Sequence, residues 1–203
     1  GLMPDTVAYL ESLGVSLPHS RPFVGIEYID AVTGHTAKGR FPEKPGLGVR
    51  RTALHHALSR RASELGVTRC HHRVKSVSQD ADGVYADRFA GRYLIAADGL
   101  HSQVRRQTGL LSARPRKHAR YGSRRHYRVA PWSDSVQVYW SHRCEAYVTP
   151  VAPDTVGVAI LHKKPGNYDD LMSDFPQLKA RLKDPVSKLR GAGPFDQKTQ
   201  ARV

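Results

Sequence analysis

The sequence predicts a mixed fold of the α/β (α+β) class, in which part of a doubly wound domain is followed by an antiparallel sheet. Two observations support this class. Helical patterns and one unbroken apolar run occupy the first 119 residues, whereas short runs with alternating apolar residues dominate from residue 120 onward. A chain of 203 residues is long enough for one sizeable domain or two small ones.

Two helical segments flank a hairpin near the start of the chain. Residues 5–13 read as a helix, and residues 23–41 alternate loosely around a turn at Thr33-Gly34, which predicts a β-hairpin. In residues 51–65 the apolar side chains recur at helical spacing on one face, and Gly66 fits the position that ends a helix.

The middle of the chain predicts a strand, a sharp turn and a short helix. Residues 80–83, "DADG", are a turn signal. The run 93–97, "YLIAA", is apolar without alternation, which is typical of a strand covered on both faces. It ends at Asp98-Gly99, and a helix is expected from Ser102, as its N-cap, to about Thr108.

The second half has a different character. Residues 120–161 contain short β-rich runs with period two, which predict an antiparallel meander of about four strands with one solvated face. Polar helical turns follow at 168–174 and 177–183, and "GAGP" at 191–194 reads as a loop.

Charge and cysteine content limit the classes of function. The 32 Lys+Arg against 18 Asp+Glu give a net charge of +14, which favours anionic partners: nucleic acid, an acidic membrane surface or a phosphorylated cofactor. Cys70 and Cys144 lack the spacing of a disulfide framework or a zinc site, and no metal site is expected. The absence of an apolar run long enough for a membrane span, or of a signal peptide, predicts a cytoplasmic protein.

Asp98-Gly99 admits two interpretations. In open α/β sheets, ligands bind beyond the carboxyl ends of the strands, and a carboxylate there can accept hydrogen bonds from a sugar hydroxyl or a water. Glycine lets the backbone approach a ligand closely, and a helix N-terminus favours phosphate. An ordinary turn between strand and helix explains the same dipeptide equally well.

The wider sequence around this turn resembles a known signature. "IAADGLHSQVRR" is similar to the "(G)ADGxxSxVR" motif of FAD-dependent monooxygenases related to para-hydroxybenzoate hydroxylase, and of their relatives the geranylgeranyl reductases and flavin-dependent halogenases. Upstream, "GVRRTALHHAL" resembles the "R-x-x-L-x-x-x-L" helix of these proteins through Arg51, Leu54 and Leu58. "GAGP" is similar to the loop that precedes their last flavin strand.

The resemblance implies a domain plan. Residues 1–119 correspond to part of the FAD-binding domain with an inserted hairpin, lacking the N-terminal GxGxxG unit. Residues 120–190 correspond to the antiparallel sheet and helices of the substrate domain, which covers the isoalloxazine face. Residues 191–203 correspond to the start of the return to the FAD domain.

The resemblance also implies cofactor contacts. Arg51 is expected to reach the phosphate and ribose region of FAD. Asp98, with Gly99 beside it, is expected near the pyrophosphate and in the use of NAD(P)H, while Ser102 and Arg105 hold the turn. The flavin carries the chemistry, so no catalytic residue is assigned.

The resemblance further implies that the parent protein is an FAD-dependent, NAD(P)H-using oxidoreductase, either a monooxygenase or a reductase of a small or lipid-like organic substrate. Five residues of the expected meander have side chains able to line a substrate pocket, although aromatic residues on a sheet more often belong to the core: Tyr121, His126, Tyr139, Trp140 and Tyr147.

Two flavin-binding segments are not found in the sequence: the strand–GxGxxG–helix unit and a "GDAAG"-like segment. Both ends read as cut, so the chain is expected to be an internal fragment that is inactive by itself. Two alternatives remain. The first is a basic nucleic-acid-binding module, suggested by the charge and by "RYGSRRHYR" at 120–128 but without a nucleic-acid-binding motif. The second is the inactive remnant of a disrupted flavoprotein gene.

Overall fold

The structure is a computed structural model that describes residues 1–110 and 119–195. It divides into two compact units: residues 1–68 with 120–194, and residues 69–119 with the end of the chain. Residues 111–118, and residues 196–203 at the end of the last predicted segment, lie outside the described residues.

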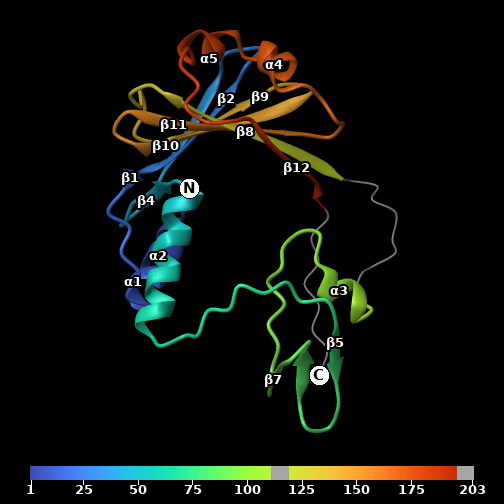
Figure 1. The fold of residues 1–203 in the computed structure, drawn as a ribbon. Helices are drawn as coiled ribbons and strands as arrows, with labels where there is room; N and C mark the ends of the chain where they lie inside the picture. The colour runs from blue at the N-terminus through green and yellow to red at the C-terminus, as the bar shows by residue number, and fades with distance from the viewer. Residues whose placement is uncertain (111–118, 196–203) are drawn as a thin grey trace. The chain divides into compact units, whose positions relative to one another are not determined.

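The larger unit is built on a seven-stranded mixed sheet (Figure 1). Its strands, in spatial order, are β12 (Arg190–Phe195), β8 (Arg120–Arg128), β11 (Thr155–His162), β10 (Cys144–Ala152), β9 (Val136–Trp140), β2 (Gly25–Asp30) and β3 (Thr36–Arg40). Strands β9, β10 and β11 form an antiparallel meander, but β8 pairs antiparallel with β11 and not with β9, so the four predicted strands are antiparallel without following one another in chain order. The predicted hairpin is β2–β3, and β2 extends the sheet by pairing in parallel with β9.

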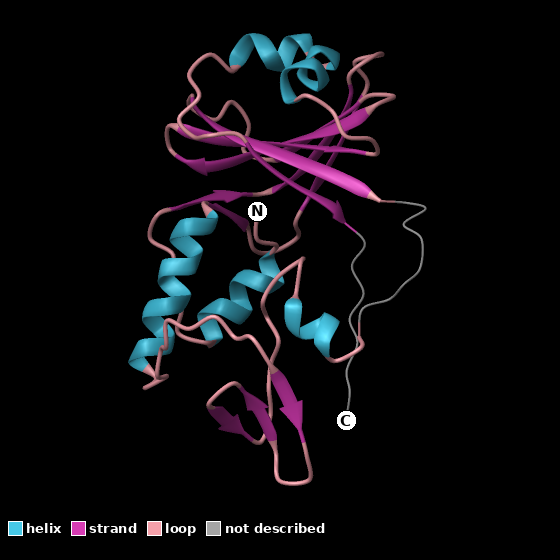
Figure 2. Cartoon of the chain, turned by 45° about the vertical axis from the view of Figure 1, so that its right-hand side comes forward, coloured by secondary structure: helices cyan, strands magenta, loops and turns pink. Residues whose placement is uncertain are grey.

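One face of this sheet is covered by short helices (Figure 2). They are α4 (Tyr168–Leu171), the 3₁₀ helix η1 (Met172–Asp174) and α5 (Pro176–Arg181). Val156, Val158 and Ile160 alternate toward them along β11 and are each 1% exposed. The main core therefore lies between the sheet and these helices. Burial of such apolar side chains is the largest favourable contribution to folding.

The other side of the sheet carries a smaller assembly (Figures 1 and 2). It consists of β1 (Ser20–Phe23), β4 (Gly46–Val49), α1 (Pro4–Ser12) and α2 (Arg51–Glu64). Strand β4 runs so close to β10 that a Cβ on Gly48 would lie 1.6 Å from the Pro150 carbonyl oxygen, so only glycine fits there. The helix at 51–64 confirms the prediction, but its apolar face is only partly covered, since Leu58 is 40% and Leu65 63% exposed.

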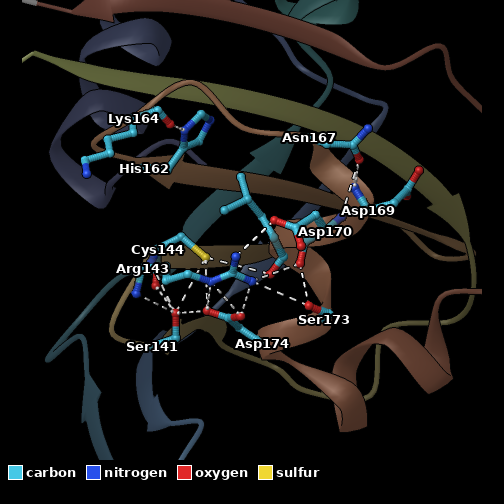
Figure 3. A network of polar contacts seen from close by, with 11 residues as sticks. Ser141, Arg143, Cys144, His162, Lys164, Asn167, Asp169, Asp170, Ser173 and Asp174 are labelled. Atoms are coloured by element: carbon cyan, nitrogen blue, oxygen red, sulfur yellow. Dashed lines mark hydrogen bonds and ion pairs between the residues drawn. The ribbon is translucent and has the colours of Figure 1, made fainter.

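A polar network fastens the short helices to the sheet (Figure 3). Arg143, in the turn between β9 and β10, donates to Asp170 Oδ2 at 3.0 Å through Nη1 and to Asp174 Oδ1 at 3.0 Å through Nε. Ser141 Oγ donates to Asp174 Oδ2 at 2.7 Å. The Arg143 guanidinium beside Asp174 holds the pKa of that carboxyl below its usual range.

The smaller unit contains a three-stranded antiparallel sheet and one short helix. The strands are β5 (Val77–Gln79), β6 (Val84–Ala86) and β7 (Phe89–Gly91), and the predicted turn at 80–83 joins the first two. The helix α3 (Gln103–Gln107) begins after its predicted N-cap, Ser102, whose side chain accepts a hydrogen bond from the Arg105 amide.

Two further sequence expectations are wrong. The run 93–97 is not a strand buried on both faces: it lies outside the strands, and Tyr93 and Ile95 are 87% and 88% exposed. An apolar run becomes a buried strand only where neighbouring strands and helices cover it, and no described strand pairs with this one. The loop expected at 191–194 instead belongs to β12, because it pairs with the edge of β8.

The Arg143–Asp174 pair makes stability depend on pH. A carboxyl whose pKa is lowered by folding stabilises the protein above its unfolded pKa of about 4, and that contribution is lost as the pH falls through the folded pKa. We expect Asp174→Asn to lower the free energy of unfolding by about 1 kcal/mol at pH 7, and the difference from the unmodified protein to disappear in acid. Urea unfolding at pH 7 and in acid, below the folded pKa of Asp174, measures the two free energies of unfolding. Asp170→Asn is the matched control with a smaller effect, because that side chain is 62% exposed; an Asp174→Asn effect of equal size in acid would contradict the account.

Candidate functional site

The Asp98-Gly99 turn is organised by the hydrogen bonds of its own carboxylate. Asp98 Oδ2 accepts from the backbone amides of Gln103 at 2.9 Å and Val104 at 3.3 Å, at the start of α3. A hydrogen bond from Ser102, followed by those from the backbone amides, lowers the pKa of Asp98. The carboxylate therefore satisfies amides that a helix leaves without partners.

Gly99 has a backbone requirement of its own. Its φ is +89°, a conformation that residues with a side chain rarely adopt. Its carbonyl accepts from the Ser102 amide at 3.1 Å, and Arg105 Nη2 donates to the Leu100 carbonyl at 2.9 Å. The predicted positioning role of Ser102 and Arg105 agrees with these contacts. The turn is thus shaped by local chemistry, and any contact of Asp98 or Gly99 with a cofactor stays a prediction.

Arg51 is the first residue of α2 and is exposed. The preceding N-cap residue, Arg50, has an extended backbone, and its side chain makes no capping hydrogen bond within the described residues. Two guanidinium groups thus stand at the positive end of a 14-residue helix. Arg51 belongs to the larger unit, whereas Asp98 and Gly99 belong to the smaller one.

The five pocket candidates divide between the two faces of the large sheet. Tyr139 packs its ring edge-to-face on Phe175 of the helix-covered face, so it is a core residue. Tyr121 shares that face, because it pairs with His162 in register and stacks on it. The remaining three, His126, Tyr147 and Trp140, lie on the opposite face, hereafter the second face, because they alternate with helix-facing neighbours.

The second face carries an aromatic group with a carboxylate. Tyr28 and Trp140 meet edge-to-face with their ring centres 6.0 Å apart, and they are 46% and 53% exposed. Tyr147 Oη donates to Glu145 Oε2 at 2.6 Å, and Arg120 Nη1 lies 3.3 Å from Glu145 Oε1. Burial, together with this bond to Glu145, raises the pKa of Tyr147 to about 12, so the phenol stays protonated at neutral pH.

Along β8 the second face becomes basic. Arg124 and His126 alternate along β8 on this face, and burial, followed by the charges of Arg50 and Arg124, lowers the pKa of His126. The sequence identified His126 as a candidate pocket residue, but it did not identify Arg50 or Arg124. The alternation of β8 could have placed Arg124 beside His126, whereas nothing local in the sequence places Arg50 there.

The described residues contain no group of three or more His, Cys, Asp or Glu side chains arranged to hold a metal ion. In the same part of the chain, none of the helices has both the length and the apolar composition that crossing a membrane requires.

The mixed sheet with short helices on one face, the basic start of α2 and the Asp98-Gly99 turn before α3 define a mixed α/β fold. The chain belongs to the FAD binding domain family, whose model matches residues 14–160. The resemblance drawn from residues 51–58 and 95–106 is therefore confirmed at the level of the family. No curated protein matches the sequence.

Solved structures of flavoproteins share the fold. A triple mutant of the flavin-dependent brominase Bmp2 has a TM-score of 0.75 at 20% identity, covering 95% of this chain and 57% of its own. A flavin-dependent halogenase from Xanthomonas campestris has 0.76 at 13%, covering 94% and 52%. Klebsiella pneumoniae HpxO, complexed with FAD and uric acid, has 0.70 at 18%, covering 94% and 57%. The chain thus spans a little over half the length of these proteins.

The hydrogen bonds of Asp98 predict a local effect of its removal. In Asp98→Ala the amides of Gln103 and Val104 lose their acceptor, and we expect their hydrogen exchange to accelerate about 5-fold, since a side chain that accepts from the first amides of a helix contributes about 1 kcal/mol. Exchange measured by NMR checks this, with Asp98→Asn intermediate because it keeps an acceptor oxygen. Asp82→Ala, in the turn at 80–83 of the same unit, is the control. Unchanged exchange at both amides would show that the carboxylate does not hold the helix start.

Proposed function

We propose that this sequence is the central part of an FAD-dependent oxidoreductase that takes reducing equivalents from NAD(P)H and acts on a small organic substrate. The observation that carries the proposal is the match of the FAD binding domain model across residues 14–160, which include α2 and the strands β8 to β11 as far as Ile160. The share of about half the length of similar flavoproteins supports a longer parent protein. A cytoplasmic location remains a prediction.

The residues present fit one part of FAD. Arg51 stands exposed at the start of a 14-residue helix, beside a second arginine and free backbone amides. Guanidinium groups and helix N-termini are the donors that phosphate groups prefer in proteins. We therefore assign Arg51 to the phosphate and ribose region of FAD. Asp98 and Gly99 stay candidates for the pyrophosphate region, where the capped turn presents a fixed backbone.

FAD, when bound, supplies the redox chemistry, whether the parent protein is a monooxygenase, a reductase or a halogenase. The chain's own contribution is binding, orientation and exclusion of water. The second face of the sheet suits this role, because it offers aromatic surface from Tyr28, Trp140 and Tyr147 and a protonated phenol that donates to Glu145. The opposite face is filled by the helices and their core.

Arg51 provides the test of this function in the parent protein. We expect Arg51→Gln to weaken FAD binding about 10-fold or more, because a hydrogen bond to a charged group is worth about 1.5–3 kcal/mol. Titration of the apoprotein with FAD, followed by flavin fluorescence, measures the Kd. Arg60→Gln is the matched control, since Arg60 lies on the same helix and pairs with Glu64. Two results together would overturn the proposal. The parent protein would bind no FAD, and NADPH would not bleach the flavin absorbance in the absence of oxygen.

The 203-residue chain by itself should not retain flavin. Arg51 and Asp98 offer two polar contacts of about 1.5–3 kcal/mol each. Their sum of about 3–6 kcal/mol reaches only the lower end of the 4–15 kcal/mol commonly estimated for the freedom lost on association, which leaves no surplus for tight binding. We expect a colourless preparation without NAD(P)H oxidase activity after addition of FAD and gel filtration. A yellow protein with stoichiometric flavin would show that other residues of this chain replace the phosphate-binding glycine loop.

A further inference from the structure

In the smaller unit, the Asp87 carboxylate holds a segment that has no regular secondary structure. Asp87 lies in the turn between β6 and β7 with a φ of +50°. Its Oδ2 accepts from the Lys75 amide at 2.9 Å and from His72 Nε2 at 2.8 Å, and its Oδ1 accepts from the Ser76 amide and hydroxyl, each at 2.9 Å. The bonds from the Lys75 amide and His72 hold the pKa of this carboxyl far below its usual range, so it accepts as a carboxylate. A hairpin turn accounts for Asp at a positive φ, but not for these contacts with residues 72–76.

A ring contact adds to this attachment. The His72 ring meets Phe89, the first residue of β7, edge-to-face with the ring centres 5.4 Å apart. The Arg88 guanidinium lies 5.2 Å from the centre of the same Phe89 ring. Residues 72–76 are therefore held against the β6–β7 turn by ring packing as well as by the Asp87 carboxylate.

The Lys75–Ser76 peptide group is bonded on both sides. Its N–H, the Ser76 amide, donates to Asp87 Oδ1, and its carbonyl, that of Lys75, accepts from Gln107 Nε2 at 2.6 Å. Gln107 is the last residue of α3 and lies 32 positions after Lys75. Hydrogen bonds on the two sides of one peptide group polarise it and strengthen each other. Asp87 and Gln107 are thus connected through a single peptide group.

The position of α3 depends on polar contacts. None of its five residues, all of which the structure describes, is buried. At its start two backbone amides donate to the Asp98 carboxylate, and at its end Gln107 donates to the Lys75 carbonyl. The Asp98-Gly99 turn and α3 therefore form one hydrogen-bonded unit, and Gln107 fastens this unit to the segment that Asp87 holds.

We propose that Asp87 and Gln107 are positioning residues for the Asp98-Gly99 turn. The Asp87 carboxylate fixes the Lys75–Ser76 peptide group, Gln107 fastens the end of α3 to it, and the fixed helix holds the turn in the conformation that a cofactor meets. Neither side chain contacts the cofactor, because both act through the backbone. The inference rests on the proposed function, which assigns the turn to the pyrophosphate region of FAD.

The first experiment uses the 203-residue chain without FAD, so that its outcome does not depend on flavin binding. A hydrogen bond to the Lys75 carbonyl gives the Gln107 side-chain amide a downfield, slowly exchanging NMR signal, which is assigned by its loss in Gln107→Ala. Asp87→Gly removes the carboxylate and keeps a residue suited to a positive φ. We expect Asp87→Gly to remove the Gln107 signal and to accelerate exchange of the Gln103 and Val104 amides about 5-fold, the effect of one lost hydrogen bond.

A double substitution tests whether Asp87 acts through Gln107. Gln107 is exposed, and Gln107→Ala alone should accelerate exchange of the same two amides about 5-fold. Asp87→Gly in that background should add little, because the connection is already broken. Asp87→Asn, which keeps one acceptor oxygen, should lie between Asp87→Gly and the unmodified chain. Arg106→Ala changes the neighbouring exposed position of α3 and is the matched control, with exchange unchanged.

The second experiment extends the test to the parent protein. Gln107→Ala should raise the Kd for FAD about 5-fold, because a turn that is less often in its binding conformation binds more weakly. Arg106→Ala should leave the Kd unchanged. A parent protein that binds no FAD would contradict the proposed function, and with it the cofactor part of this inference, whereas the exchange data would still show whether Asp87 and Gln107 position the turn.

Three outcomes would overturn the inference. The first is unchanged exchange of the Gln103 and Val104 amides in Gln107→Ala, in a chain whose spectrum shows that it is folded. The second is additive acceleration in the double variant, which would show that Asp87 stabilises the smaller unit without acting through Gln107. The third is an equal Kd for FAD in the Gln107→Ala and Arg106→Ala parent proteins.

Discussion

The antiparallel register of β8, β11 and β10 is the constraint on which the rest of the larger unit depends. Because successive side chains of a strand point to opposite faces, this register decides which residues become core and which remain available for ligands. Val158 pairs with Arg125 and Val148 on the face that the helices cover, whereas Ala159 pairs with Arg124 and Tyr147 on the other. A shift of one residue in β8 would bury Arg124 under the helices and expose Tyr127.

The short helices α4, η1 and α5 cover one face of the large sheet, so a ligand can reach only the second face. Arg143 connects the β9–β10 turn to Asp170 and Asp174, and the Tyr127 and Tyr168 hydroxyls meet at 3.2 Å beneath the helices. These polar contacts are local to the covered side. The second face instead has the exposed rings of Tyr28 and Trp140, and its Arg124 forms no ion pair among the described residues, whereas Arg120 pairs with Glu145. Exposed apolar surface of this kind is typical of a face that contacts a ligand or another segment.

Periodic patterns in the sequence predicted those helices, strands and turns whose formation depends on residues near one another in the chain. The helix at 51–64, the hairpin β2–β3 and the four strands β8 to β11 follow from periodicity and turn residues. The run 93–97 was misjudged because an apolar run carries no information about which segments cover it. The Arg143 network joins residues 27 to 31 positions apart, and, besides burial, Arg50, the N-cap of α2, lowers the pKa of His126 from a distant part of the sequence, so neither could be inferred from local spacing.

The cofactor residues differ in how much of their role the structure supports. Arg51 stands where the motif predicts, at an exposed helix start that suits phosphate. Asp98 and Gly99 have sufficient local reasons for their identity, namely a capped helix and a positive φ. The sequence motif alone could not separate these roles, because a turn residue and a ligand-binding residue leave the same pattern.

The central claim is that the second face, and not the helix-covered face, lies against the flavin. The chain has two tryptophans, with Trp140 on the second face and Trp132 packed under α5, where Arg181 lies over its ring. Fluorine NMR of the parent protein labelled with 5-fluorotryptophan, assigned through Trp132→Phe and Trp140→Phe, measures both sites with and without FAD. The account predicts that FAD moves the Trp140 resonance and leaves that of Trp132 in place; movement of Trp132 alone would contradict it.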